Sequence, residues 1–227
     1  MRMPVRRPSW LTASAPPTVA IEIAARRVTV VGVGDSTAGA TVTGQASEAL
    51  PVGLVTPALT GVNIQDAATL SDVLKRVVER TGLGVPKRIA LVLPDSIARV
   101  SLLPFDQLPA RAADLDELIR WQLKKATPYP LEEAQVTHFV ASTESPTTTM
   151  AALVARRDVV AQYEDMVERL GMHAGLVDLA SLNVMNAVIS AGAAPAGDWL
   201  FVHLAAEATS LAILRGRDLL FYRHRLL

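Results

Sequence analysis

The stretch from Arg88 to Glu133 constrains the fold more than any other part of the chain. It opens on an apolar, β-branched run at Arg88–Leu93, which is typical of a buried strand. A second strand is expected after the turn at Pro94–Ser96, and a helix follows it. The helix is indicated by apolar side chains spaced i, i+3, i+4 and i+8, which place one stripe on one face; they are Leu115, Leu118, Ile119 and Leu123.

The ends of this helix can also be predicted. Asp114 followed three residues later by Glu117 matches a capping box, so we expect the helix to begin near Leu115. Pro128 and Pro130 lack the backbone donor that a helix needs, and we expect the helix to end near Ala126.

The rest of the chain alternates strands with amphipathic helices, which predicts an α/β fold. One helix carries an apolar stripe from Leu70 to Val78 and stops at Gly82, and another carries one from Val159 to Leu170 and stops at Gly171. Further strands are expected at 18–23, 28–34, 40–48, 134–143, 149–155 and 174–179, with a helix up to 191 and two apolar runs plus the start of a third in 197–227.

Composition excludes several classes of function. The 22 basic and 22 acidic residues cancel, so the chain lacks the net charge of a nucleic-acid-binding protein. It has no cysteine, which excludes disulfides, thiolate catalysis and thiolate zinc sites. Residues 1–17 are expected to be a flexible leader, because their apolar section is too short for a secretory signal. We expect a protein without a membrane span.

Two segments carry a family resemblance: LVLPDSIARVSLLPF at 91–105 and DELIRWQLKKATPYPLEEA at 116–134. They resemble PilM, a family of actin-like cytoplasmic proteins of type IV pilus assembly. Gln122 departs from the family pattern, which has an acidic residue there. The resemblance covers roughly residues 18–227, and the residues that carry it are Leu93, Pro94, Arg99, Pro109, Arg120, Trp121, Pro128, Tyr129, Pro130 and Glu133.

The resemblance implies an actin-like (ribonuclease H-like) architecture, related to FtsA, of which this sequence holds the N-terminal portion. Residues 18–96 and 173–196 would form the first half, and residues 97–172 would form a small α+β subdomain inserted into it, here called the insert. Residues 197–227 would be the opening hairpin of a second half that is largely absent. A face of that hairpin would then lack its usual cover.

In this family two glycine-bearing hairpins hold the phosphates and magnesium of ATP. The first aligns with Glu22, Ala24, Ala25 and Arg26, in which the acid is lengthened and the glycine is replaced. The second aligns with His203, Ala205 and Thr209, of which only the threonine matches. We therefore expect degenerate nucleotide loops, no bound ATP or magnesium, and no enzymatic activity.

Other catalytic sites are not indicated. The four histidines, at 138, 173, 203 and 224, lack the spacing of a metal site and are expected to be core or surface residues. No GxSxG motif is present. Asp116–Glu117 and Glu132–Glu133 are expected to be solvated surface pairs.

The resemblance implies a cytoplasmic scaffold, peripheral to the inner membrane, that binds the cytoplasmic tail of a PilN-like membrane protein in a groove beside the insert. Arg120, Trp121 and Tyr129 are the candidate contacts, and for Trp121 and Tyr129 a plain core role is the alternative. A homo-oligomer is compatible with the sequence, whereas nucleic acid is not an expected partner. The alternative functions are an actin-like ATPase of the pilus machine and a GspL-like domain of a type II secretion system.

Overall fold

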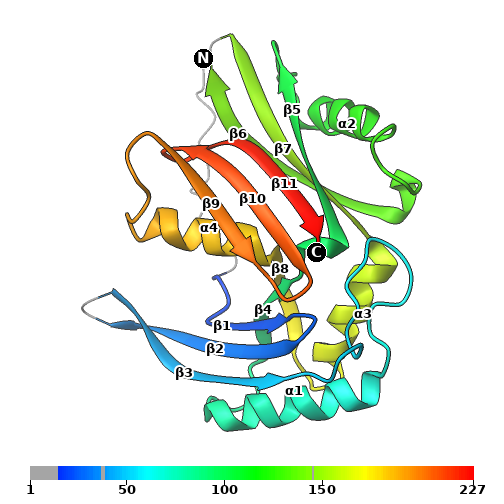
Figure 1. Cartoon of the computed structure of the whole chain (residues 1–227), viewed down its shortest axis with the longest axis vertical. Coiled ribbons are helices and arrows are strands. Elements are labelled where there is room, and N and C mark those ends of the chain that lie inside the picture. Colours follow the sequence, from blue (N-terminus) through cyan, green and yellow to red (C-terminus); the bar gives the residue numbers. More distant parts are fainter. Residues whose placement is uncertain (1–14, 37–38, 145) are drawn as a thin grey trace, which may run out of the picture.

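Three β-sheets contribute to one central core in the computed structural model, and a second, smaller core lies between one of these sheets and the helix at 112–123 (Figure 1). The structure describes residues 15–36, 39–144 and 146–227. Most of the leader expected at 1–17 therefore lies outside the described residues.

The largest sheet has five strands in the order β3-β2-β1-β4-β8. β1 runs antiparallel to β2 and parallel to β4, and β4 runs parallel to β8. This mixed sheet is the centre of the expected first half, and the carboxyl ends of β1 and β4 meet at one edge. Its strands are β1 (Val19–Ile23), β2 (Arg27–Ser36), β3 (Gly39–Ala49), β4 (Arg88–Leu93) and β8 (His173–Leu179).

Helix α1 (Ala67–Thr81) has clear signals at both ends. The Asp66 carboxylate accepts hydrogen bonds from two backbone amides of the first turn, and Gly82 ends the helix in the left-handed conformation with a φ of 71°. α1 packs against β2 and β3 and against α3 (Arg157–Glu168), while α4 (Ala180–Ser190) lies on the opposite side of the sheet (Figure 1).

The segment predicted to be the insert holds a three-stranded antiparallel sheet in the order β5-β7-β6, covered by α2, and it also includes α3, which packs against α1 and β8 (Figure 1). The side chains of β7 alternate between two cores: Met150, Ala152 and Val154 face α2, and Ala151 faces the main core. The insert is therefore fixed to the first half by one face of its sheet. The elements of this sheet and its cover are β5 (Ala98–Phe105), α2 (Ala112–Leu123), β6 (Ala134–Glu144) and β7 (Thr147–Arg156), with short 3-10 turns η2 (Asp95–Ile97) and η3 (Leu131–Glu133).

Helix α2 begins earlier than the capping pattern predicted. Its N-cap is Arg111, whose side chain makes no capping hydrogen bond, and Asp114 lies within the first turn at 3.7 Å from the Arg111 guanidinium. The carboxylate is still well placed, because a negative charge in the first turn interacts favourably with the helix dipole. The helix ends at Leu123, three residues before the predicted end. The apolar stripe is oriented as predicted, since Ile119 and Leu123 are fully buried.

The final 30 residues form a three-stranded antiparallel sheet rather than a hairpin alone. Its inner face joins the main core, and β11 packs across β5 and β6 of the insert. Its outer face leaves Leu200, Val202 and Leu204 exposed. The strands are β9 (Asp198–Leu204), β10 (Ala208–Arg215) and β11 (Asp218–Leu226).

Among the described residues, no helix combines the length and the apolar character that a bilayer crossing requires.

Candidate functional site

Two tight turns face each other across a cavity of about 390 Å³, here called the site cavity. One turn joins β1 to β2 at residues 24–26, and the other joins β9 to β10 at residues 205–207. The cavity therefore opens between the first half and the third sheet. Six of the seven residues that the family pattern marked as nucleotide loops line it: Glu22, Ala24, Ala25, Arg26, His203 and Ala205.

Thr209, the seventh marked residue, does not line the site cavity. It lies on β10 between Ala208 and Ser210, and those two neighbours line the cavity instead. Because successive side chains of a strand point to opposite faces, Thr209 belongs to the outer face of the third sheet. The one family residue that this hairpin retains is thus turned away from the site.

An ion pair joins the two turns that line the site cavity. Arg26 Nε lies 3.1 Å from Glu207 Oε1. Both side chains are about two-fifths exposed, so the pair contributes little to stability. The pair instead affects what the site can bind, because the Arg26 guanidinium already interacts with the Glu207 carboxylate.

Asp95 forms the floor of the cavity and connects three elements. Its Oδ1 accepts hydrogen bonds from the backbone amide and the hydroxyl of Ser181 on α4, at 3.1 and 2.9 Å. Its Oδ2 accepts one from the Ser210 hydroxyl on β10, at 2.6 Å. Tyr222 completes the cluster, with its hydroxyl 2.8 Å from that of Ser181. A buried carboxylate is thus held by donors from two elements distant in sequence.

These contacts shift two pKa values in opposite directions. Burial disfavours the charged form of Asp95, but the interactions with His203, Ser210 and Ser181 outweigh it and hold the pKa of Asp95 below its ordinary value. The Asp95 carboxylate in turn raises the pKa of His203, whose Nδ1 is 3.5 Å from Asp95 Oδ2. At that distance the contact is electrostatic rather than a well-formed hydrogen bond.

Charged groups of both signs line the site cavity. Magnesium prefers oxygen ligands, and in the described part of the chain no three His, Asp or Glu side chains come together as a metal site would require. Three carboxylates, at Glu22, Asp95 and Glu207, line the cavity together with the guanidinium groups of Arg26 and Arg27. Alanine supplies much of the remaining wall.

Sequence reasoning missed five residues of this site: Asp95, Ser96, Ser181, Ser210 and Tyr222. It also treated His224 as an ordinary core or surface residue. One signal was available, because Asp95 and Ser96 follow directly after the buried strand β4, and polar residues at the carboxyl ends of parallel strands often form sites. The others are brought to the cavity by tertiary packing.

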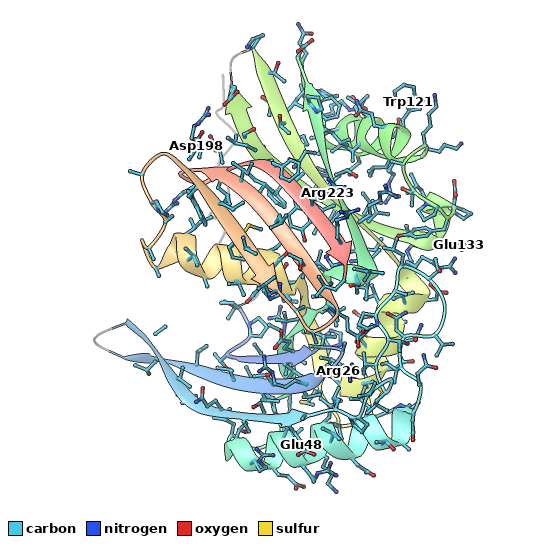
Figure 2. The ribbon with its side chains drawn as sticks, in the orientation of Figure 1. Arg26, Glu48, Trp121, Glu133, Asp198 and Arg223 are labelled. Carbon is cyan, nitrogen blue, oxygen red and sulfur yellow. The ribbon has the colours of Figure 1, made fainter. Side chains whose placement is uncertain are left out.

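The three residues predicted to bind a partner lie together on the insert. Arg120, Trp121 and Tyr129 line a concavity, here called the Trp121 concavity, that is formed by residues 117–132 alone. It is therefore not the predicted groove between the insert and the first half, and Trp121 projects from the outer side of α2 (Figure 2).

The two aromatic residues of this concavity differ in exposure. Trp121 is 70% exposed, which excludes the core alternative for this residue. Tyr129 is buried, donates a hydrogen bond of 3.3 Å to the Val154 carbonyl, and packs under the Arg156 guanidinium. Tyr129 is thus a wall of the concavity, and Trp121 is the side chain available to a partner.

Comparisons with known proteins agree with this architecture. A structure titled "PilM-PilN type IV pilus biogenesis complex" superposes with a TM-score of 0.80 at 20% identity, covering 93% of this chain and 62% of that chain. The cytoplasmic domain of EpsL, an inner-membrane component of the type II secretion system of Vibrio cholerae, gives 0.56 at 10% identity, covering 92% and 70%. A Bacteroides thetaiotaomicron protein with an actin-like ATPase fold gives 0.54 at 8% identity, covering 93% and 70%.

These likenesses confirm the predicted actin-like α/β fold. No curated protein sequence matches the chain. The chain spans somewhat less than two thirds of the PilM chain that it resembles. The family model described as "Type IV pilus assembly protein PilM" matches residues 20–227, which is most of the sequence. The chain therefore belongs to the PilM family of type IV pilus assembly proteins.

Proposed function

We propose that this chain is a nucleotide-independent adaptor of type IV pilus assembly, located in the cytoplasm beside the inner membrane. The observation that carries the proposal is the Arg26–Glu207 ion pair, which joins the two turns between which the actin-like fold holds phosphate. A phosphate group entering there would have to break this pair and approach Glu22 and Asp95. The replacement of glycine by Ala24 and Ala205 also hinders close approach of a phosphate to the backbone.

The proposed partner is the cytoplasmic tail of a PilN-like inner-membrane protein, and the proposed binding surface is the Trp121 concavity. An exposed tryptophan in a concave, proline-lined surface is a favourable anchor, because burying its ring gains a large apolar area while few rotatable bonds are fixed. Pro128 and Pro130 keep the neighbouring wall rigid, which lowers the cost of binding. The family match favours this role over a type II secretion role.

The binding proposal predicts a specific mutational effect. A peptide copying the tail of the neighbouring PilN-like protein is expected to bind without nucleotide at micromolar affinity, about −8 kcal/mol. Trp121→Ala is expected to weaken binding by more than about 1 kcal/mol, because the anchor ring is removed, and to leave the fold intact because that ring is exposed. Isothermal titration calorimetry gives the affinities, and circular dichroism checks the fold.

Two controls make this experiment decisive. Val184→Ala removes an exposed apolar side chain from α4, outside the Trp121 concavity, and should leave the affinity unchanged. Binding should also change little between low and moderate salt, because Arg120 and Lys124 in the concavity are balanced by Glu117 and Glu132. If the unmodified protein binds no such tail, the adaptor role is wrong. If Trp121→Ala binds normally, the tail binds elsewhere.

The competing function is an ATPase whose loops have diverged but still bind nucleotide. Titration with magnesium-ATP distinguishes the two functions, since affinity tighter than about millimolar, near −4 kcal/mol, would contradict the adaptor proposal.

Restoring the family residues of one hairpin is a sharper test of whether the site can bind ATP. Glu22→Asp combined with Ala24→Gly restores the family residues of the first hairpin, yet we expect no saturable ATP binding. His203 and Ala205 still leave the second hairpin without its acid and its glycine, and Glu207 still pairs with Arg26. Equilibrium titration of the double variant checks this result. Saturable binding after this repair alone would show that the second hairpin and the ion pair are not obstacles.

A further inference from the structure

A chain of four hydrogen-bonded side chains leads from the floor of the site cavity to Ser96. The Ser96 hydroxyl oxygen is 3.0 Å from His224 Nε2, and His224 Nδ1 is 3.0 Å from the Ser210 hydroxyl oxygen. Ser210 in turn donates to Asp95 Oδ2 at 2.6 Å. The chain thus has the order of a nucleophilic serine, a histidine base and a carboxylate, with Ser210 inserted between the last two.

Counting protons gives the donor and the acceptor of each hydrogen bond that links Ser96, His224, Ser210 and Asp95. Asp95 is ionised, so its Oδ2 can only accept, and the single Ser210 proton must point to it. Ser210 therefore accepts from His224 Nδ1, which places the histidine proton on Nδ1. His224 Nε2 then carries a lone pair and accepts the Ser96 proton. This is the polarity that a general base needs to activate a serine hydroxyl.

The other carboxylate oxygen of Asp95 supports the same hydrogen-bond directions. Its Oδ1 already accepts two hydrogen bonds from Ser181, so neither carboxylate oxygen has a proton to give. Burial of the imidazole lowers the pKa of His224, which favours the neutral, proton-accepting form near pH 7. Among the charged groups near His224, Asp95 favours its protonation and His203 opposes it, and Arg99, Tyr222 and Arg223 line the same hollow as His224.

Ser96 is accessible from a second hollow as well as from the site cavity. A cleft of about 490 Å³, here called the junction cleft, lies between the 57–59 loop, the start of β5 and the end of β11, and Ser96 and His224 line it. Leu59, Val100 and Leu226 give it apolar walls, and Arg99 and Arg223 add two cations. It can therefore accept a short apolar group beside a developing negative charge.

We propose that Ser96 is an activated nucleophile that accepts a short apolar acyl group from a carboxylic ester in the junction cleft. Ser96 Oγ forms a bond to the carbonyl carbon while His224 Nε2 takes the hydroxyl proton. The bond from that carbon to the alcohol oxygen then breaks, and His224 returns the proton to the departing alcohol. Arg99 and Arg223 favour the negative charge on the carbonyl oxygen. Water, activated by His224 in the same way, hydrolyses the acyl-serine to a carboxylic acid and free Ser96. This activity does not depend on the adaptor role.

The activity can be tested with p-nitrophenyl acetate as the probe. The expected result is a burst of about one nitrophenol per chain, with one acetyl group found on Ser96 by peptide mass mapping. Ser96→Ala should abolish the burst. His224→Gln keeps a hydrogen-bonding side chain but removes the base, and should slow acylation by about 100-fold. Ser190→Ala removes an exposed serine at the end of α4 and should leave the burst unchanged.

A pH profile separates an activated serine from a merely structural one. The acylation rate of the unmodified protein should rise with pH and level off at a midpoint below 6.5, the ordinary value for histidine. Ser210→Ala, a positioning variant, should move this midpoint because it disconnects His224 from Asp95. Because this profile is measured on the unmodified protein, it tests the role of His224 even if a His224 variant fails to fold. Acetylation confined to other residues, or a Ser96 rate that is unchanged in His224→Gln or follows no histidine titration, would overturn the proposal.

Discussion

Ile119→Asp is expected to unfold the insert. Ile119 is fully buried at the centre of the core between α2 and the β5-β7-β6 sheet, where Phe105, Leu123 and Met150 also lie. The substitution loses about 2 kcal/mol of apolar burial and places a charge without a partner in an apolar core, at a further cost of several kcal/mol. The sum is comparable with the whole stability of a typical domain, about 5–15 kcal/mol. Urea unfolding followed by circular dichroism, with limited proteolysis of the 97–172 segment, measures the loss.

The matched control is a change on the exposed face of the same helix. Glu117→Ala removes an exposed side chain two residues away and should alter the free energy of unfolding by less than about 0.5 kcal/mol. Asp116→Ala is less suitable, because Asp116 Oδ1 lies 2.6 Å from His138 Nε2 on β6. Similar unfolding curves for Ile119→Asp and Glu117→Ala would contradict the packing of α2 against this sheet.

Secondary structure with strong periodicity could be predicted from the sequence. Helix α1 has five buried apolar residues on one stripe, an aspartate cap and a terminal glycine, so local signals and tertiary packing agree. The start of α2 could not be placed in the same way. Ala112 and Ala113 continue the helix before the capping pattern, since alanine favours a helix, and Arg111 carries no capping side chain by which the boundary could be recognised.

One part of the candidate site could be predicted from the sequence and another part could not. The family spacing located both hairpins, and they do meet at one cavity. The hydrogen-bonded chain could not be located, because Ser96 and His224 are 128 positions apart and meet only when β11 packs beside η2. Local spacing carries no information about such a contact. Thr209 shows the converse, since it matches the family pattern but faces away from the cavity on β10.

The second large effect is expected at Asp95. Asp95→Ala should lower the free energy of unfolding by about 3 kcal/mol or more at pH 7, because it leaves the Ser181 amide and the Ser181 and Ser210 hydroxyls buried without their acceptor. Each unsatisfied buried donor costs about 1–3 kcal/mol, and relaxation of the hydroxyls recovers part of the sum. Asp198→Ala, which breaks an exposed pair with Arg215, should leave the stability nearly unchanged.

The pH dependence of this difference distinguishes an ionised Asp95 from a neutral one. The pKa of Asp95 is lowered in the folded protein, so its stabilising effect is present above the unfolded value of 3.8 and is lost as the pH falls through the lower folded value. The pKa of His203 is raised by Asp95, so that contribution is present below 6.5 and is lost as the pH rises through the folded value. The stability difference between the unmodified protein and Asp95→Ala should therefore grow as the pH falls from 8 to 6 and stay constant down to about pH 5. Urea unfolding at each pH measures it. A difference that keeps growing as the pH falls from 6 to about 4 would mean that the pKa of Asp95 is raised and that Asp95 is protonated in the fold, and the proton count that activates Ser96 would fail with it.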